Sequence, residues 1–107
     1  MAIEGFQAVA KVEAVPPGQP KVVTMNDRTI ALFNADGKVY AIHNLCPHEG
    51  GPLNEGRVKG FIVSCPWHDL AFDIRNGQGI DGGGHCVGSY DVRIEGGEIY
   101  VGPRRKQ

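Results

Sequence analysis

Glycine and proline break this chain into short segments and so limit the elements that it can form. The 107 residues include sixteen glycines and seven prolines. No window keeps apolar residues at the i, i+3, i+4, i+7 spacing of a helix for three turns. The segments between the turns are rich in β-branched residues, which favour strands. We therefore expect no long helix and an all-β fold, a small antiparallel β sandwich or barrel of short strands.

Turn residues place the ends of the expected strands. Asn26–Asp27 and Gly96–Gly97 are typical of two-residue hairpin turns, and Ala35–Gly37 and Asn76–Gly77 mark two more turns. The strands expected between turns are Phe6–Val12, Lys21–Met25, Arg28–Asn34, Lys38–His43, Phe61–Ser64, Leu70–Ile74, Ser89–Glu95 and Glu98–Gly102.

Length and charge bound the class of protein. A chain of 107 residues is expected to form one domain, residues 1–107. The net charge of -1 gives no support for binding to nucleic acid or to a membrane surface. The chain has no run of eighteen apolar residues to span a membrane, and its first residues lack the basic and apolar regions of a signal peptide. We expect a cytoplasmic protein.

Two short pairs of cysteine and histidine are the strongest functional signal. Cys46 and His48 form the first pair, and Cys65 and His68 form the second, with sixteen residues between the pairs. They contain two of the three cysteines and two of the four histidines of the chain. In a cytosolic protein, cysteines and histidines clustered in this way indicate metal ligands rather than disulfides.

Two kinds of metal centre remain open at this point. Structural zinc takes four cysteine and histidine ligands, usually in pairs separated by two to five residues. Cys65 and His68 have that spacing, but the single residue between Cys46 and His48 is a tight gap for one ion. If each pair divides its ligands between two irons, the short gap is no obstacle.

The order C-x-H, sixteen residues, C-x-x-H resembles the Rieske iron–sulfur motif. The flanks “NLCPHEGGPLNEG” and “SCPWHDLAFDIRNGQ” are similar to the two cluster-binding loops of small soluble Rieske ferredoxins, and the similarity extends over nearly the whole chain. This resemblance implies one [2Fe–2S] cluster, with Cys46 and Cys65 on one iron and His48 and His68 on the other. It also implies a one-electron carrier, with no small-molecule substrate and no catalysis of its own. Such carriers pass electrons from a flavin-dependent reductase to a ring-hydroxylating oxygenase.

The resemblance also places the chain in the low-potential branch of the family. High-potential members have two further cysteines that form a disulfide clamp, and the matching positions here are Gly51 and Trp67. They also place a serine and a tyrosine hydroxyl near the cluster, at positions that Leu70 and Phe72 occupy here. Since hydrogen bonds to the cluster favour its reduced state, we expect a potential in the lower half of the Rieske range of about −150 to +300 mV.

Two rivals to this interpretation stay open. The small subunit of a nitrite-reductase-like enzyme shares the expected fold, and a zinc-stabilised interaction module would use the same residue types. Cys86 and His85 lie outside the motif. We interpret them as residues with no ligand role.

Overall fold

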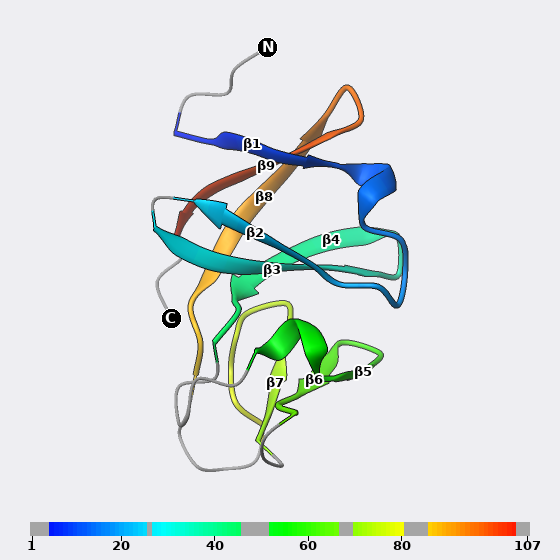
Figure 1. Cartoon of the computed structure of the whole chain (residues 1–107), viewed down its shortest axis with the longest axis vertical. Coiled ribbons are helices and arrows are strands. Elements are labelled where there is room, and N and C mark those ends of the chain that lie inside the picture. The colour runs from blue at the N-terminus through cyan, green and yellow to red at the C-terminus, as the bar shows by residue number, and fades with distance from the viewer. Residues whose placement is uncertain (1–4, 26, 46–51, 67–69, 81–85, 105–107) are drawn as a thin grey trace.

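The computed structural model describes residues 5–25, 27–45, 52–66, 70–80 and 86–104. It confirms the predicted all-β antiparallel fold, with two sheets (Figure 1). The six-stranded sheet has the order β1 (Gln7–Lys11), β9 (Glu98–Arg104), β8 (Ser89–Glu95), β4 (Lys38–His43), β3 (Arg28–Ala35) and β2 (Lys21–Met25). The three-stranded sheet has the order β5 (Arg57–Lys59), β6 (Ile62–Ser64) and β7 (Ala71–Asp73).

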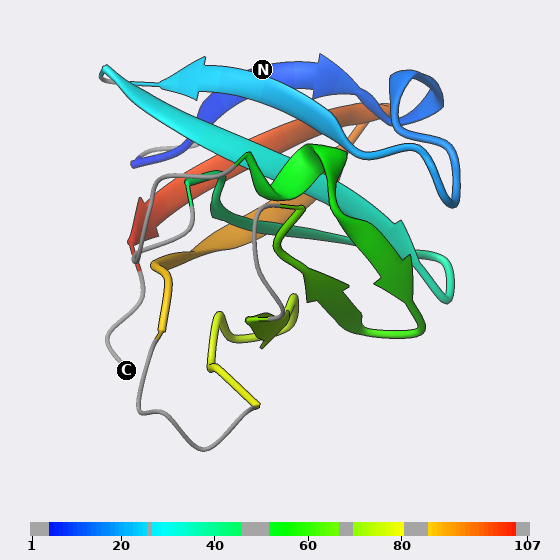
Figure 2. The same ribbon diagram turned by 60° about the horizontal axis from the view of Figure 1, so that its bottom comes forward.

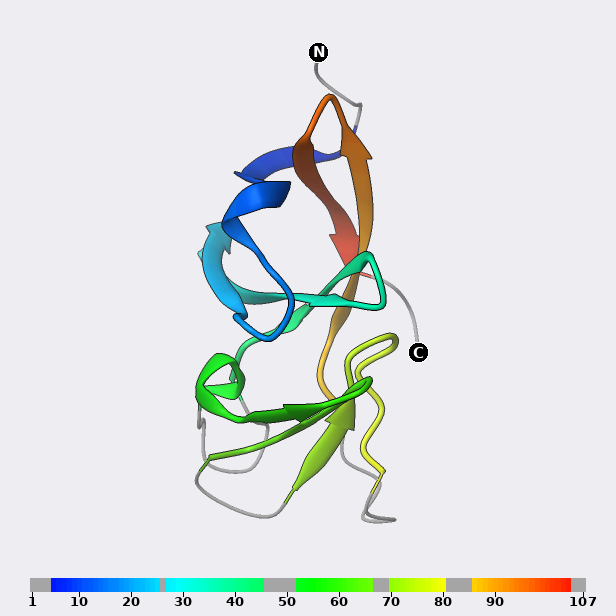
Figure 3. The same cartoon turned by 90° about the vertical axis from the view of Figure 1, so that its right-hand side faces the viewer.

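The six-stranded sheet curls so far that its two edge strands meet. Strands β1 and β2 stand at opposite ends of the strand order, yet they contact one another. The sheet is therefore nearly a barrel, and we call it the barrel. The three-stranded sheet and the 3₁₀ turn η2 (Leu53–Glu55) form a small lobe, which Figure 3 shows stacked below the barrel. A second 3₁₀ turn, η1 (Val12–Ala14), follows β1.

Most strands have the bounds that the turn residues predicted. Strands β2, β4 and β8 match the predicted ranges residue for residue, whereas β6 and β7 are shorter than predicted and β9 is longer. Gly96 and Gly97 have φ angles of 58° and 79°, as a two-residue turn that matches the twist of a hairpin requires. The short strand β5 and both 3₁₀ turns were not predicted.

Strand β3 separates two hydrophobic cores because it is buried on both of its faces. Ile30 and Leu32 point into the barrel, and Ala31 and Phe33 point the other way, toward the small lobe. The barrel core consists of Val15, Met25, Ile30, Leu32, Val39, Ala41, Tyr90, Ile99 and Val101. The lobe core consists of Ala31, Phe33, Ile42, Leu53, Val63, Cys65, Phe72, Ile74 and Val87. A continuous apolar run such as Ile30–Phe33 is the pattern of a strand covered on two sides.

Within the described ranges, the helical segments are short 3₁₀ turns, none of which could span a bilayer.

Candidate metal centre

Of the four predicted ligands, the structure describes Cys65. The other three, Cys46, His48 and His68, lie outside the described residues, as do Gly51, Trp67 and His85. Cys65 follows directly after β6, and its side chain is buried, with 4% of its surface exposed. Its backbone N–H donates a hydrogen bond to the carbonyl oxygen of Leu70 at 2.7 Å. The second predicted loop is therefore closed at its base, between β6 and β7.

The first predicted loop, residues 46–51, is also closed at its base. Leu45 and Pro52 pair as an isolated bridge, although six residues separate them in the sequence. Asn44 holds the two sides together, since its carbonyl oxygen accepts from the N–H of Leu53 at 2.6 Å and its Oδ1 accepts from the N–H of Asn54 at 2.8 Å. The loop that carries Cys46 and His48 thus begins and ends at one place.

Asn44 is itself fixed from the barrel side. It is buried, with 5% of its surface exposed, and its N–H donates to the carbonyl oxygen of Thr29 on β3 at 3.0 Å. Turn η2, which follows the loop, contacts β3 as well (Figure 2). The base of the first loop is therefore positioned by the barrel rather than by the loop alone.

The bases of the two loops lie against one another at Gly56. This residue follows η2, and a Cβ atom added to it would overlap the carbonyl oxygen of Ser64, the residue before Cys65. The carbonyl carbon of Ser64 would lie 3.0 Å from that Cβ. Only glycine allows this approach, so the end of the first loop region is in direct contact with the strand that leads to the second.

The surroundings of Cys65 fit an iron–sulfur ligand. Its neighbours in the lobe core include Leu53, Val63, Phe72 and Val87, all of which are buried. An apolar shell of this kind limits the access of water to a metal centre and influences its potential. Among the described residues, no three cysteine, histidine or acidic side chains gather at one point. Of the four predicted ligands, Cys65 is therefore the one whose surroundings the structure describes.

Cys86 and His43 lie outside the predicted ligand set. Cys86 is exposed and pairs with Gln78 as an isolated bridge, and neither Cys86 nor Cys65 forms a disulfide. His43 ends β4 and is half-buried. Burial and the positive charges of Arg104 and Arg28 lower the pKa of His43 below its usual value of 6.5.

A salt bridge stabilises the turn after β7. The Nη2 atom of Arg75 lies 2.8 Å from Oδ2 of Asp73, and the backbone N–H of Arg75 donates to Oδ1 at 2.9 Å. The hydrogen bond from the guanidinium is the main cause that lowers the pKa of Asp73. The Arg75 guanidinium also lies 4.4 Å from the centre of the Phe61 ring, so this turn is packed onto the small lobe.

Sequence reasoning missed Asn44 and Gly56. Asn44 is one polar residue between a strand and a cysteine, and a backbone contact such as that of Gly56 leaves no pattern in one sequence. Their roles follow from tertiary contacts that only the folded chain shows.

Comparison with known proteins agrees with this arrangement. The sequence model of the Rieske [2Fe-2S] domain matches residues 5–90. The chain belongs to this family. The ferredoxin component of the naphthalene 1,2-dioxygenase system from Pseudomonas aeruginosa is 30% identical over 107 residues, which cover 94% of this chain and 97% of that protein.

Similarity in structure points to the same kind of protein. The ferredoxin of carbazole 1,9a-dioxygenase from Nocardioides aromaticivorans IC177 superposes with a TM-score of 0.86 at 30% identity, over 94% of this chain and 99% of the other. The nitrite reductase [NAD(P)H] large subunit of Klebsiella oxytoca is 31% identical over 102 residues, 91% of this chain but 11% of that protein. The predictions of a Rieske family member and of a [2Fe–2S] cofactor are confirmed.

Proposed function

We propose that this chain is a one-electron carrier, formed as a single Rieske domain over residues 1–107. Its [2Fe–2S] cluster is held by Cys46 and Cys65 on one iron and by His48 and His68 on the other. The observation that carries the proposal is the buried Cys65 at the closed base of a loop, in a chain that matches the Rieske domain over residues 5–90. When bound, the cluster supplies a centre that gains and loses one electron.

The protein residues support this centre from two sides. Leu53, Val63 and Phe72 cover Cys65 with apolar surface, which excludes water from the thiolate side of the site. Asn44 and the contact of Gly56 with Ser64 keep the two loop bases at a fixed separation. Ligands that start from fixed positions need little rearrangement when the charge of the centre changes.

The partners follow from the relatives. Ferredoxin components of dioxygenase systems are similar to this chain over nearly its full length. We therefore propose that a ring-hydroxylating oxygenase receives the electron and that a flavin-dependent reductase supplies it, in the cytoplasm. On this proposal the chain catalyses no reaction of its own, and its net charge of -1 favours no role with nucleic acid.

The nitrite-reductase alternative is favoured by the similarity to a short part of the Klebsiella oxytoca protein. Reconstitution separates the two functions. Reduced protein mixed with the oxygenase component of the naphthalene 1,2-dioxygenase system should support oxidation of the aromatic ring. Support for nitrite reduction alone, with a nitrite reductase that lacks its own Rieske domain, would favour the alternative.

The content of the centre tests the proposal most directly. Purified protein should contain two irons and two acid-labile sulfides per chain, with visible absorption that bleaches on reduction. Cys65→Ser should abolish both the absorption and the sulfide. Cys86→Ser is the matched control, since Cys86 is exposed and outside the motif, and it should leave both unchanged. One zinc and no sulfide in protein from iron-supplied cells would favour the zinc module and contradict the proposal.

A further inference from the structure

Two arginines and a histidine lie together at one end of the barrel, where the charges of Arg28 and Arg104 act on His43. Each of the three is the direct cross-strand partner of a residue of the barrel core. The pairs are Arg28 with Met25, His43 with Ile30 and Arg104 with Tyr90. Residues paired in this way project from the same face of a sheet. The three side chains therefore project from the inner face of the sheet, at the mouth of the barrel.

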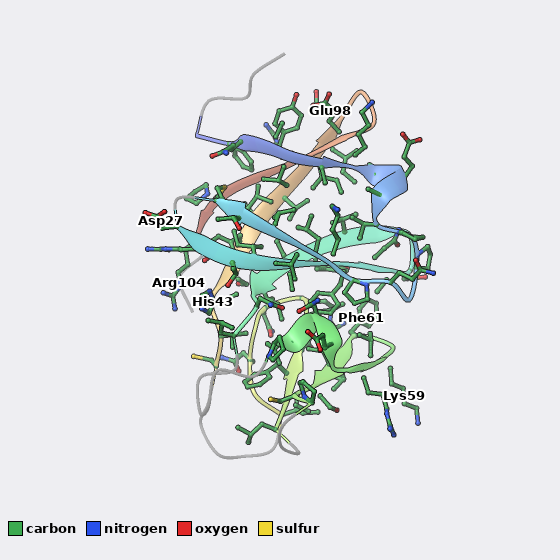
Figure 4. All side chains as sticks on the ribbon, in the orientation of Figure 1. Asp27, His43, Lys59, Phe61, Glu98 and Arg104 are labelled. Carbon is green, nitrogen blue, oxygen red and sulfur yellow. The ribbon has the colours of Figure 1, made fainter. Side chains whose placement is uncertain are left out.

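A glycine allows Arg104 to take this position. A Cβ atom on Gly88 would lie 2.6 Å from Nε of Arg104, so the guanidinium lies directly against the backbone there. The carbonyl oxygen of Gly88 in turn accepts a hydrogen bond from the N–H of His43 at 2.7 Å. Figure 4 shows Arg104 and His43 beside one another at this edge of the barrel.

Asp27 precedes Arg28 in the chain and lies at the same edge of the barrel (Figure 4), but within the described part of the chain it forms no ion pair with either arginine. Among the described residues, the recorded ion pair joins Asp73 and Arg75 in the small lobe, and neither Arg28 nor Arg104 has a carboxylate within ion-pair distance. The charged groups that face His43 are these two arginines, on β3 and β9, and their charges lower its pKa. The guanidinium groups of Arg28 and Arg104 therefore place positive charge at the mouth.

The mouth also contains a cavity of about 470 Å³. Its floor is apolar and consists of the core residues Met25, Tyr90 and Val101, and Arg28 and Arg104 stand at its rim. Phe6 forms one wall, where its ring lies so close to Gly102 that a Cβ atom there would overlap it. Small-molecule sites usually have roughly 300–1,000 Å³ of volume, mostly apolar walls and a few converging polar groups. The cavity has such a volume, and its two guanidinium groups stand over an apolar floor.

We propose that the barrel mouth binds a small organic carboxylate. Two guanidinium groups fit the planar carboxylate with paired hydrogen bonds, and the apolar floor takes the hydrocarbon body of the ligand. An inorganic anion would satisfy the arginines but would leave the floor without a partner. The site consists of barrel residues and includes none of the predicted cluster ligands. Evidence against carboxylate binding would therefore leave the proposed electron-carrier function unaffected, and the reverse also holds.

Calorimetry on the oxidised holo-protein tests the site, with benzoate as the probe and the ionic strength held constant. Benzoate should bind at least about tenfold more tightly than acetate, because acetate has only a methyl group to place on the floor. Arg28→Gln combined with Arg104→Gln should weaken benzoate binding by at least about tenfold. Arg104→Lys keeps the positive charge but loses the paired N–H donors of the planar guanidinium, so it should weaken benzoate binding by an intermediate factor.

Lys59→Gln is the matched control, because it removes one positive charge from the small lobe, outside the cavity. It should leave benzoate binding unchanged. Visible absorption and far-ultraviolet circular dichroism of each variant would show that the fold and the centre are retained. Where the double variant fails to fold, the two single Gln variants carry the same test.

Several results would overturn the proposal. One is that benzoate does not bind at millimolar concentration, and another is that the double variant binds it as tightly as the wild type. Acetate or phosphate binding as tightly as benzoate would show a general patch of positive charge. A neutral-capped glutamate tripeptide that binds more tightly than benzoate would assign the mouth to the acidic side chain of a protein partner instead.

Discussion

The barrel and the small lobe are stabilised in different ways. Barrel strands have five to eight residues and are joined at β2–β3, β3–β4 and β8–β9 by turns of two residues. Strands of the small lobe have three residues each. The barrel core is formed almost wholly by barrel strands, whereas the lobe core takes Ala31, Phe33 and Ile42 from β3 and β4. The small lobe therefore depends on the barrel, on a few anchoring contacts and, by proposal, on its bound cluster.

Gly56→Ala should have the largest of four effects that test this difference. The added methyl group would overlap the backbone of Ser64, and backbone cannot move aside as the end of a side chain can. Overpacking of this kind costs roughly 1–3 kcal/mol. Native-state hydrogen exchange should show the loss in β5, β6 and β7, while the amides of the barrel keep their protection.

Gly60→Ala is the matched control in the same lobe. Gly60 has a φ angle of +62°, but a Cβ atom there meets open space. This substitution carries the backbone cost alone, about 1–2 kcal/mol. If the two variants lost the same stability and kept iron equally well, the contact of Gly56 with Ser64 would not be what joins the two loop bases.

The same difference explains what the sequence could predict. Barrel hairpins are specified locally, because turn residues such as Gly96 and Gly97 fix the ends of strands that alternate or are fully apolar. The bounds of β6 and β7 were less accurate, and β5 was missed. Three-residue strands form few hydrogen bonds, so tertiary contacts decide where they begin and end.

For the candidate site, the sequence identified the family and a set of predicted ligands, but not the residues that support the loops. The spacing of Cys46, His48, Cys65 and His68 identified the family, which the comparisons confirm. The ligand roles of these four residues stay predictions. The supports of the loops were not predictable, since Asn44 acts through hydrogen bonds to residues nine and ten positions further along the chain.

Asn44→Ala should have the second-largest effect, again in the small lobe. It removes the buried acceptor of the half-buried Asn54 N–H, so the cost should be near the lower end of the roughly 1–3 kcal/mol for a fully buried unsatisfied donor. Because the base of the first loop would open more often, an iron chelator should remove iron faster than from the wild type. Asn76→Ala is the control, since Asn76 makes a similar hydrogen bond to the Gln78 N–H in an exposed turn. Equal rates of iron loss in the two variants would argue against Asn44 as an anchor.

Leu70→Ser and Phe72→Tyr should change the potential more than the stability. Each adds a hydroxyl beside the proposed cluster, where a donor favours the reduced form. Leu70 faces Cys65 across the loop base, through the hydrogen bond from the Cys65 N–H to its carbonyl oxygen. Each variant should therefore raise the potential, by less than the roughly 1.5–3 kcal/mol of a charge-assisted hydrogen bond.

Protein-film voltammetry would measure both shifts against a wild-type potential in the lower half of about −150 to +300 mV. Phe72 is fully buried in the lobe core, so its new hydroxyl must be accommodated within packed side chains. Phe72→Tyr should for that reason be less stable than Leu70→Ser. A wild-type potential near the top of the range, or no rise in either variant, would contradict the low-potential assignment.

Acid should affect the two regions in separate pH windows, and this is the smallest of the four effects. His43 at the barrel mouth has a lowered pKa, so the unfolded chain takes up a proton before the folded barrel does. Stability should therefore begin to fall as the pH drops below about 6.5. Asp73 in the small lobe also has a lowered pKa, through its hydrogen bond from Arg75, but its usual value is 3.8. Its contribution is present at neutral pH and is lost only as the pH drops through its folded pKa.

Two substitutions separate these windows. His43→Gln should remove the first loss of stability and leave the second, and Asp73→Asn should do the reverse. Asp73→Asn should lower the stability at neutral pH only slightly, because the side chain of Arg75 is 51% exposed and water screens the pair. Melting temperatures measured from pH 8 to pH 2 on both variants would show the windows, with hydrogen exchange to locate each loss in the barrel or in the small lobe. If His43→Gln left the loss below pH 6.5 unchanged, that loss would have to come from another group than the histidine at the mouth.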